Sequence, residues 1–433
     1  MNDYVFGNKI HRLRKAMGIS QNQLADMLGI TGKAISKWEN GCAKPQIDTI
    51  KKLAAIFNVS VDDLLCSSAP DKQITKIVIT GGPCAGKTTA LCKIQEHFSQ
   101  LGYCVIFIPE AATELITGGI APWTLNTNLD YQLCLLQMQM QKEEIFEKAA
   151  EAIFGHDKIL LVCDRGTMDN RAYMSDAEFS RALSALDLNV TELRDRYDAV
   201  FHLVSAAKGA EAFYTLADNA ARTETVEEAA AIDDRLIAAW TGHPHLRVID
   251  NATDFQSKLS RLIAEIASFL GEPEPFEIER KFLIEYPQIK LLEADPNCRR
   301  VEIIQTYLRA SDGDEVRVRQ RGENGHYIYF KTTKRTVSGA KRVEIESRLS
   351  KEEYLTHLME ADTSKKQIRK TRYCLMYKNQ YFEIDVYPFW DDKAILEIEL
   401  CDENDSIRFP SHIRVIKEVT DDPSYKNAAL ADR

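Results

Sequence analysis

One stretch, residues 81–88, constrains the fold of this chain more than any other. It reads Gly81-Gly82-Pro83-Cys84-Ala85-Gly86-Lys87-Thr88, which fits the pattern G-x-x-x-x-G-K-[ST]. An apolar run over 74–80 precedes it and a predicted helix follows it. In a strand–loop–helix of this kind, backbone N–H groups of the loop and of the first helical turn cradle phosphate oxygens. The stretch therefore predicts a phosphate-binding loop, and a surface turn that matches by chance is the alternative.

Two side chains at the end of this loop have predicted roles. Lys87 is expected to reach the terminal phosphates of a bound nucleotide, ATP or GTP, and the Thr88 hydroxyl to hold Mg²⁺. The predicted nucleotide-binding stretch continues to Thr89. Cys84 is interpreted as a small filler in the loop, with a redox role as the less favoured alternative.

Length and composition limit the class of protein. A chain of 433 residues exceeds what one core usually supports, so two or three domains are expected. Ten cysteines without a C-x-x-C pair, no leader sequence and no apolar run long enough for a bilayer predict a cytoplasmic protein with reduced thiols and no membrane contact. The formal charge of −10 disfavours a protein wholly coated in nucleic acid but allows one small basic module.

Residues 6–65 read as a series of short amphipathic helices. Ser20 is the predicted N-cap of a helix over 21–28, and a short turn leads into a second helix over 32–40. Two helices joined by such a turn are typical of a helix-turn-helix. Ile35 and Trp38 fall on the apolar side of the second helix and are expected in the core.

This segment resembles the repressor-like (XRE/Cro-type) helix-turn-helix family. The resemblance is carried by SQNQLA at 20–25, AISKWENG at 34–41 and Pro45. It implies DNA binding, with Lys33, Ser36 and Lys37 facing the major groove and Gln21 near a backbone phosphate. By analogy it also implies a homodimer on two half-sites. A helical bundle used for dimerisation or protein docking is the alternative.

The central segment alternates predicted strands with helices, which indicates a parallel sheet with ligands at the carboxyl ends of its strands. After the first strand, the further apolar runs lie at 104–108, 158–163, 199–204 and 246–249. Asp164 ends one run and is expected to hold Mg²⁺. Glu110 follows another, and it either accepts a proton from a substrate hydroxyl or is an ordinary surface glutamate.

Two arginines are candidates for stabilising charge on a transferring phosphoryl group. Arg165 directly follows Asp164, and Arg222 lies in a polar stretch, 218–224, suited to a mobile lid. For Arg222 an ordinary solvated lid residue is an almost equal alternative.

The central segment resembles a P-loop group, the kinase-like ATPases that include nicotinamide riboside kinase domains. The resemblance covers about 74–271 and rests on GGP at 81–83, PEAATE at 109–114, DRG at 164–166 with Asp169 and Tyr173, and VIDN at 248–251. It implies nucleoside-triphosphate binding with small-molecule-kinase topology. Some members carry a nucleotidyltransferase between a helix-turn-helix and the kinase, and here only a few residues separate the two, so that activity is expected to be absent.

Beyond an acidic linker at 272–275 the periodicity becomes that of antiparallel strands. Charged residues alternate with apolar ones over many short runs, including three Glu-x-Glu pairs. Such a pair places like charges about 7 Å apart on one face, which is unfavourable unless a cation neutralises them. The pattern therefore predicts a charged lining that binds divalent metal and polyphosphate. A sheet with its charges simply in water is the alternative.

This segment resembles the CYTH family, the triphosphate tunnel metalloenzymes, over about 276–433. The opening EIERK at 277–281, which fits the ExExK hallmark, is followed in family order by further matches at 305–308, 316–319, 342–346, 397–399 and 418–420. The resemblance implies an eight-stranded tunnel in which cations grip a triphosphate, namely Lys281, Arg317, Arg319, Lys331, Arg372 and Lys417. It also implies acids that hold Mg²⁺ or Mn²⁺, namely Glu277, Glu279, Glu344, Glu346, Asp385, Glu397 and Glu399.

Together these observations predict three modules: a DNA-binding head over 1–67, a P-loop α/β domain over 74–271 and an α+β tunnel over 276–433. The expected activity is hydrolysis of a nucleoside triphosphate or inorganic polyphosphate. A regulator that senses these ligands without turnover, a nucleotide cyclase and a small-molecule kinase are the alternatives.

Overall fold

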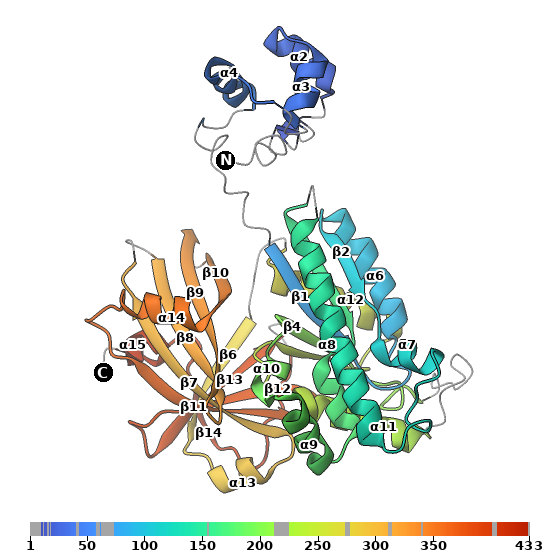
Figure 1. Cartoon of the computed structure of the whole chain (residues 1–433). Helices are drawn as coiled ribbons and strands as arrows, with labels where there is room; N and C mark the ends of the chain where they lie inside the picture. Colours follow the sequence, from blue (N-terminus) through green and yellow to red (C-terminus); the bar gives the residue numbers. More distant parts are fainter. Residues whose placement is uncertain are drawn as a thin grey trace. The chain divides into compact units, whose positions relative to one another are not determined.

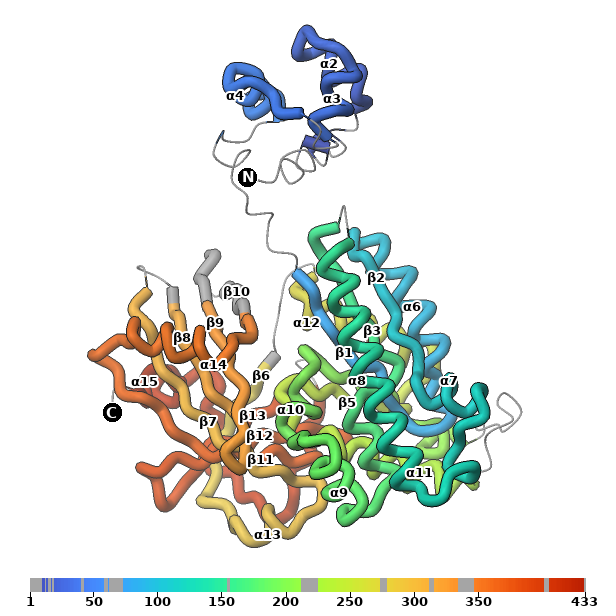
Figure 2. Tube along the Cα trace, viewed as in Figure 1, coloured from blue at the N-terminus to red at the C-terminus, as the bar shows by residue number. Residues whose placement is uncertain are grey.

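The computed structural model describes most of the chain (Figures 1 and 2). The described residues are 10–11, 13–14, 17, 19–39, 43–57, 61, 73–153, 156–211, 225–272, 278–310, 314–338, 341–400 and 405–431. Contacts between Cα atoms divide the chain into two compact units. One holds Met1–Ile74, Gly102–Cys104 and Lys148–Ile159, and the other holds Thr75–Leu101, Val105–Glu147 and Leu160–Arg433. The predicted linker at 272–275 therefore falls inside the second unit.

The N-terminal helices, drawn in Figure 1, contribute buried side chains to a small core of their own. They are α2 (Gln21–Leu28), α3 (Gly32–Glu39) and α4 (Ile47–Phe57). Ser20 caps α2 as predicted, because its hydroxyl accepts from Gln23 N while the Gln23 side chain returns to Ser20 N. Ile35 and Trp38 are buried in this core, as predicted.

The central segment is an α/β sheet with strand order β2-β3-β1-β4-β5, in which β1–β4 and β4–β5 pair in parallel. Its strands are β1 (Gln73–Thr80), β2 (Cys104–Ile108), β3 (Lys158–Asp164), β4 (Ala199–Leu203) and β5 (Leu246–Ile249). The connecting helices are α6 (Lys87–Gln100), α7 (Ala111–Thr117), α8 (Asn128–Ala152), η1 (Thr167–Tyr173), α9 (Asp176–Leu186), α10 (Val190–Arg194), α11 (Val226–Trp240) and α12 (Phe255–Leu270). This confirms the predicted fold class.

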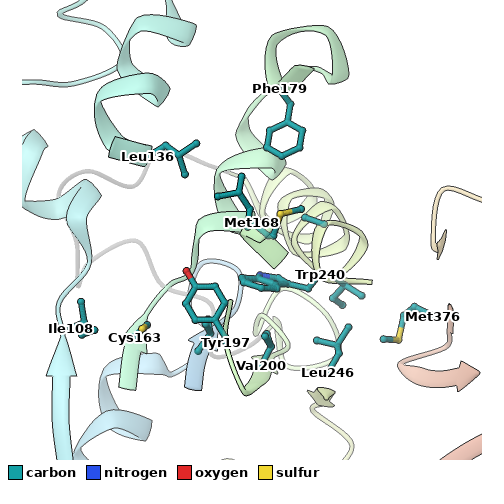
Figure 3. Close-up of a cluster of buried hydrophobic side chains, with 14 residues drawn as sticks. Ile108, Leu136, Cys163, Met168, Phe179, Tyr197, Val200, Trp240, Leu246 and Met376 are labelled. Carbon is teal, nitrogen blue, oxygen red and sulfur yellow. The ribbon is translucent and has the colours of Figure 1, made fainter. Parts of the chain in front are cut away.

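A buried apolar cluster holds the sheet to its helices (Figure 3). Trp240 at the end of α11 packs edge-on against Tyr197, with ring centroids 5.5 Å apart. Met376 belongs to the same cluster although it comes from the C-terminal sheet. The two sheets therefore share apolar packing within one compact unit.

The C-terminal segment is one antiparallel sheet with strand order β10-β9-β8-β7-β11-β12-β13-β6-β14. The strands are β6 (Ile278–Glu285), β7 (Cys298–Leu308), β8 (Asp314–Glu323), β9 (His326–Ser338), β10 (Lys341–Leu349), β11 (Ile368–Tyr377), β12 (Gln380–Val386), β13 (Lys393–Leu400) and β14 (Val415–Glu418). The helices are α13 (Ile289–Ala294), α14 (Lys351–Leu358), η3 (Pro423–Tyr425) and α15 (Asn427–Leu430). The prediction of eight strands is corrected to nine, since the short β14 adds to β6.

The register of this sheet decides which residues share a face, because directly opposite residues point to the same side. Arg319 pairs with Gln305, Arg372 with Val301 and Asp385, and Glu397 with Glu383 and Lys281. Residues two apart along a strand also point to the same side, so these pairs define one polar face of the sheet. Its charged residues include Glu279, Lys281, Arg317, Arg319, Arg321, Glu346, Lys370, Arg372, Glu383, Asp385, Glu397 and Glu399. The opposite face contributes apolar residues such as Phe282, Leu396 and Phe382 to a buried core.

No helix in the described ranges has the length and apolar character needed to cross a membrane.

Candidate phosphate-binding sites

The phosphate loop lies between β1 and α6, as predicted, and two of its glycines are required by close contacts. Gly81 has φ +151°, and a Cβ there would lie 2.2 Å from the carbonyl oxygen of Leu203. Gly86 has φ +89°, and a Cβ there would lie 2.5 Å from the Phe255 ring. Any larger residue would displace β4 or α12 from the loop.

Lys87 begins α6 and is half-buried beside three carboxylates. Its ammonium lies 3.4 Å from Gly81 O, within its own loop. Burial, together with the charge of Arg165, lowers the pKa of Lys87 to about 8, although Asp164, Glu110 and Asp169 oppose this shift. An anion bound at the loop would favour the charged form again.

Glu110 and Arg165 form an ion pair at the carboxyl ends of β2 and β3, with Oε1 and Nε 2.5 Å apart. Burial raises the pKa of Glu110, but the charges of Arg165 and Lys87 outweigh burial and bring it to about 2. Arg165 holds a left-handed backbone, φ +72°, which turns its side chain toward this site at a conformational cost. Glu110 is therefore a fixed carboxylate engaged by an arginine, not a solvated surface residue.

Asp164 ends β3 with one oxygen unsatisfied. Its Oδ1 is buried and accepts no hydrogen bond from the described residues. Burial raises the pKa of this carboxyl, with Lys87 acting against it. A buried carboxylate oxygen without a donor fits a hard divalent cation such as Mg²⁺. The predicted partner Thr88 lies in the first turn of α6 and is exposed.

Two buried acids support this site, and their role was missed by the sequence reasoning. Asp169 accepts from the Thr80 hydroxyl at 2.8 Å and from Trp240 Nε1 at 2.6 Å, and it lies 3.7 Å from Arg165 Nη1. The sequence motif contained Asp169, but nothing indicated that Trp240, 71 positions away, would bind it.

Asp233 of α11 is the second of these acids. Its Oδ1 accepts from the backbone N–H of Gly82 at 3.0 Å and of Ser205 at 3.1 Å. His202 Nε2 lies 3.0 Å from the same oxygen, and Lys208 Nζ lies 3.3 Å from Oδ2. Burial raises its pKa, but the charge and hydrogen bond of His202 and the charge of Lys208 lower it overall. Asp233 therefore ties the phosphate loop to the end of β4.

The N-terminal candidates lie on α3 as expected, with Lys33 and Lys37 exposed and Ser36 half-buried. The Gln21 side chain, which is predicted to lie near a DNA phosphate, donates to Glu39 Oε2 at 2.7 Å. Glu39 is buried and also accepts from Arg14 at 2.6 Å. Helical periodicity gave no signal for this buried ion pair, because it joins charges 25 positions apart.

On the polar face of the C-terminal sheet, cations and acids are closely paired around Glu397. Lys281 Nζ lies 2.7 Å from Glu397 and 3.1 Å from Glu279. Arg372 Nη2 lies 2.8 Å from Glu397 and 2.6 Å from Asp385. Two participants were missed by the sequence reasoning: Lys370, which contacts Asp385, and Glu383, which contacts Arg372.

These pairs shift the pKa values of their members. Burial raises the pKa of Glu397, but Lys281 and Arg372 outweigh burial and lower it. Burial and the charge of Glu397 raise the pKa of Glu279. The two glutamates therefore repel each other, and a divalent cation would stabilise the pair. In the described part of the chain no three His, Cys, Asp or Glu side chains converge into a metal cage.

A second group on the same face centres on Arg319. Its Nη2 lies 2.8 Å from Glu346, which also accepts from the Thr332 hydroxyl at 2.9 Å. Arg319 Nε is buried and donates to none of the described residues. Arg317 lies on the same face, 4.0 Å from Glu315.

Other predicted residues lie elsewhere or cannot be placed. Lys331 pairs with Val318 and Ser347, so the register puts it on the face opposite Arg317 and Arg319, where its ammonium is 3.5 Å from His357 Nε2. Its predicted contact with a triphosphate is not supported by this placement. Lys417 is exposed and 3.6 Å from Asp422, and Glu399 contacts Arg247 of β5. Arg222, Glu277 and the side chain of Glu344 lie outside the described residues.

Three protein-family models match separate segments of the chain. A helix-turn-helix family model matches residues 10–64, an AAA domain model matches 76–258 and a CYTH domain model matches 275–412. A prophage-derived HTH-type regulator of Bacillus subtilis, YonR, is 43% identical over 61 residues, or 14% of this chain. The chain spans only 56% of the length of that regulator.

The C-terminal segment has a relative that it covers almost completely. The inorganic triphosphatase of Nitrosomonas europaea is 32% identical over 159 residues, which are 36% of this chain and 96% of that protein. A solved inorganic triphosphatase structure is 29% identical over 36% of this chain and 95% of its own, with a TM-score of 0.27. Through this segment, the chain belongs to the CYTH domain family.

Proposed function

We propose that the polar face of the nine-stranded sheet binds and hydrolyses a triphosphate with Mg²⁺ or Mn²⁺. The observation that carries this proposal is Arg319 Nε, a buried donor without an acceptor among the described residues, on the face that also holds Lys281 and Arg372. A phosphate oxygen is an acceptor that a guanidinium binds through strong, charge-assisted hydrogen bonds. The relation to an inorganic triphosphatase supports the same assignment.

When a ligand binds at this face, the cations of the protein would change from carboxylate partners to phosphate oxygens. Lys281 and Arg372 now neutralise Glu279, Glu397 and Asp385. A triphosphate supplies new acceptors for the two cations, and the released carboxylates are oxygen ligands of the kind that Mg²⁺ and Mn²⁺ prefer. When bound, the metal would neutralise the phosphate chain and favour attack of water on phosphorus.

Phosphate release from inorganic tripolyphosphate, ATP and GTP, with Mg²⁺ or Mn²⁺, tests this function. Glu397→Gln keeps the side-chain shape but removes the charge, so we expect loss of tripolyphosphate hydrolysis. Lys87→Ala acts at the other site and should leave that hydrolysis intact. Turnover that survives Glu397→Gln, or its absence in the unmodified protein, would refute the proposal.

The geometry of Glu110 and Arg165 favours a second function, phosphoryl transfer at the phosphate loop. In this proposal Arg165 neutralises the transferring group, Glu110 orients an acceptor hydroxyl, and Asp164 holds Mg²⁺. Labelled ATP with a panel of nucleosides and other small hydroxyl compounds tests it. Glu110→Gln should lose transfer to the acceptor and keep ATP binding, whereas equal transfer by both proteins would contradict the role.

The first segment contributes DNA binding in this proposal, through Lys33, Ser36 and Lys37 on α3. Selection from a random DNA pool, followed by binding at several salt concentrations, identifies the site and counts its phosphate contacts. Removal of a lysine that contacts a DNA phosphate should reduce the salt slope by about 1. A homodimer predicts two half-sites, and a cytoplasmic location is part of the same proposal.

A further inference from the structure

The polar face of the C-terminal sheet is covered at one end by a short segment of the α/β domain, residues 242–247, which follows α11 and includes the first two residues of β5. Tyr381 of β12 donates its hydroxyl to His243 O at 3.0 Å and accepts from Gly242 N at 3.2 Å. Arg321 of β8 donates to Gly242 O. His245 Nε2 lies 3.8 Å from Glu346 of β10.

Arg247 of the same segment contacts Glu399 of β13. The contacts of the segment therefore extend across the sheet from β10, at its edge, to β13. The contacting residues of the sheet all lie on its polar face. Segment 242–247 therefore lies across the end of this face and does not flank one edge of the sheet.

The opposite end of the face is covered by the C-terminal helix. Tyr307, Ile368 and Ile395 lie on the polar face by register, and they form a buried apolar cluster with Leu430 and Ala431. The polar face is therefore bounded by apolar packing at this end and by polar contacts at the other.

A cavity of about 300 Å³ lies at the polar end, between β5 and α12 on one side and β12 and β13 on the other. Glu279 and Glu397 line it, so it opens onto the charges that hold Lys281 and Arg372. Its volume is at the lower end of the range for small-molecule sites.

The charge of the residues that line the cavity limits which chemical groups can bind in it. Among the described residues, its lining has seven acidic side chains and four basic ones, with Arg247 and Arg261 among the latter. A phosphate chain continuing from the cationic face into this compartment would meet net negative charge. An uncharged group is suited better, because its hydroxyl and amino groups can donate to carboxylates and an aromatic base can stack on a guanidinium.

We propose that this cavity receives the nucleoside of a nucleoside triphosphate whose phosphates lie along the polar face. This rests on the proposed triphosphatase function and specifies its substrate class. Both domains then build one site: the C-terminal sheet binds the phosphates, and β5 and α12 contribute one wall of the nucleoside compartment. A long polyphosphate chain is excluded, since both ends of the face are covered.

The test uses the full chain carrying Lys87→Ala, so that turnover reports on the polar face. Ala252→Trp and Ser406→Trp fill the cavity from its two walls, and Ser260→Trp adds the same bulk on the exposed side of α12. Steady-state phosphate release is measured with ATP, inorganic tripolyphosphate and long-chain polyphosphate, each with Mg²⁺.

We expect each filling variant to lower kcat/KM for ATP at least tenfold and to leave tripolyphosphate within twofold, with Ser260→Trp unchanged for both. Long-chain polyphosphate should not be shortened by any protein. Equal losses for ATP and tripolyphosphate, or shortening of the long chain, would overturn the inference alone. A Lys87→Ala parent that releases phosphate from neither ATP nor tripolyphosphate would overturn the proposed function as well.

Discussion

The two phosphate sites differ in how their polar groups are satisfied. At the phosphate loop, Asp164 Oδ1 has no donor among the described residues and Lys87 reaches only its own loop carbonyl and nearby charges. On the polar face of the C-terminal sheet, nearly every charge has a close partner of opposite sign, as Arg372 does with Asp385 and Glu397. At the phosphate loop, a ligand would contact polar groups that have no protein partner in the described ranges. On the polar face, a ligand would have to replace existing ion pairs.

The largest effect is expected on the polar face. Arg372→Ala leaves Asp385, Glu383 and Glu397 facing one another without their shared cation, so both binding and folding are affected. We expect tripolyphosphate hydrolysis to fall by about 10³-fold and stability to fall by about 3–5 kcal/mol. Phosphate release and urea unfolding measure the two effects. Lys331→Ala, on the opposite face, is the matched control and should change hydrolysis less than twofold.

Lys87→Ala should show the same loss confined to the phosphate loop. Lys87 is not part of a closely paired ion network of the described residues. Its removal therefore weakens the binding of the ligand but leaves no buried charges without partners. We expect ATP to bind the loop about 10²-fold more weakly, with stability changed by less than about 1 kcal/mol. Calorimetric titration in a Glu397→Gln background isolates this site. A loss of stability as large as that of Arg372→Ala would erase the distinction between the two sites.

The two sites should also differ in their response to pH. Lys87 has a pKa of about 8, so raising the pH from 7 to 9 removes its charge and weakens ATP binding at the loop, by up to about tenfold per unit above the pKa. Burial lowers the pKa of Lys281, but Glu397 and Glu279 raise it more, so this lysine stays charged over the window. Lys87→Arg should flatten the profile for the loop. An unaltered profile in that variant would assign the titration to another group.

The smallest effect is expected from Asp233→Asn. The amide can still accept from Gly82 N, but it no longer neutralises Lys208, and we expect ATP affinity at the loop to fall about fivefold. Asp234→Asn is the neighbouring control, because Asp234 is exposed and contacts only Lys208 among the described residues. Equal effects from the two variants would show that Asp233 acts on Lys208 and not on the phosphate loop.

Local sequence patterns predicted much of the secondary structure and the motifs formed by near neighbours. They did not predict contacts between residues that are far apart in the sequence. The phosphate loop and the helix-turn-helix were predicted because contacts between near neighbours define them. The resemblance to the CYTH family placed Lys281, Arg317 and Arg372 in one lining, and the register of the sheet puts them on one face. The register puts Lys331 on the opposite face, which the sequence did not reveal, because alternation cannot be carried across a hairpin without its register.

The residues that were missed share one cause. Asp233 in the middle of α11 and Trp240 at its end both support the phosphate loop site, and Arg14 supports Glu39 across the N-terminal bundle. Nothing in their own neighbourhood marks them, since their partners are brought close only by the tertiary fold. Arg321 continues the alternation of Arg317 and Arg319, but its partner Asp195 lies in another segment.

Arg321 has a practical consequence for dissecting this protein. Arg321 is 1% exposed, and Asp195 and Gly242 accept hydrogen bonds from its guanidinium. A fragment that begins at the linker near residue 275 would bring this arginine and Tyr381 into water, and the complementary fragment would expose Asp195. Expression trials guided by family boundaries would thus cut through a buried interior, and the two segments that hold the candidate phosphate sites should be cloned, purified and assayed as one piece.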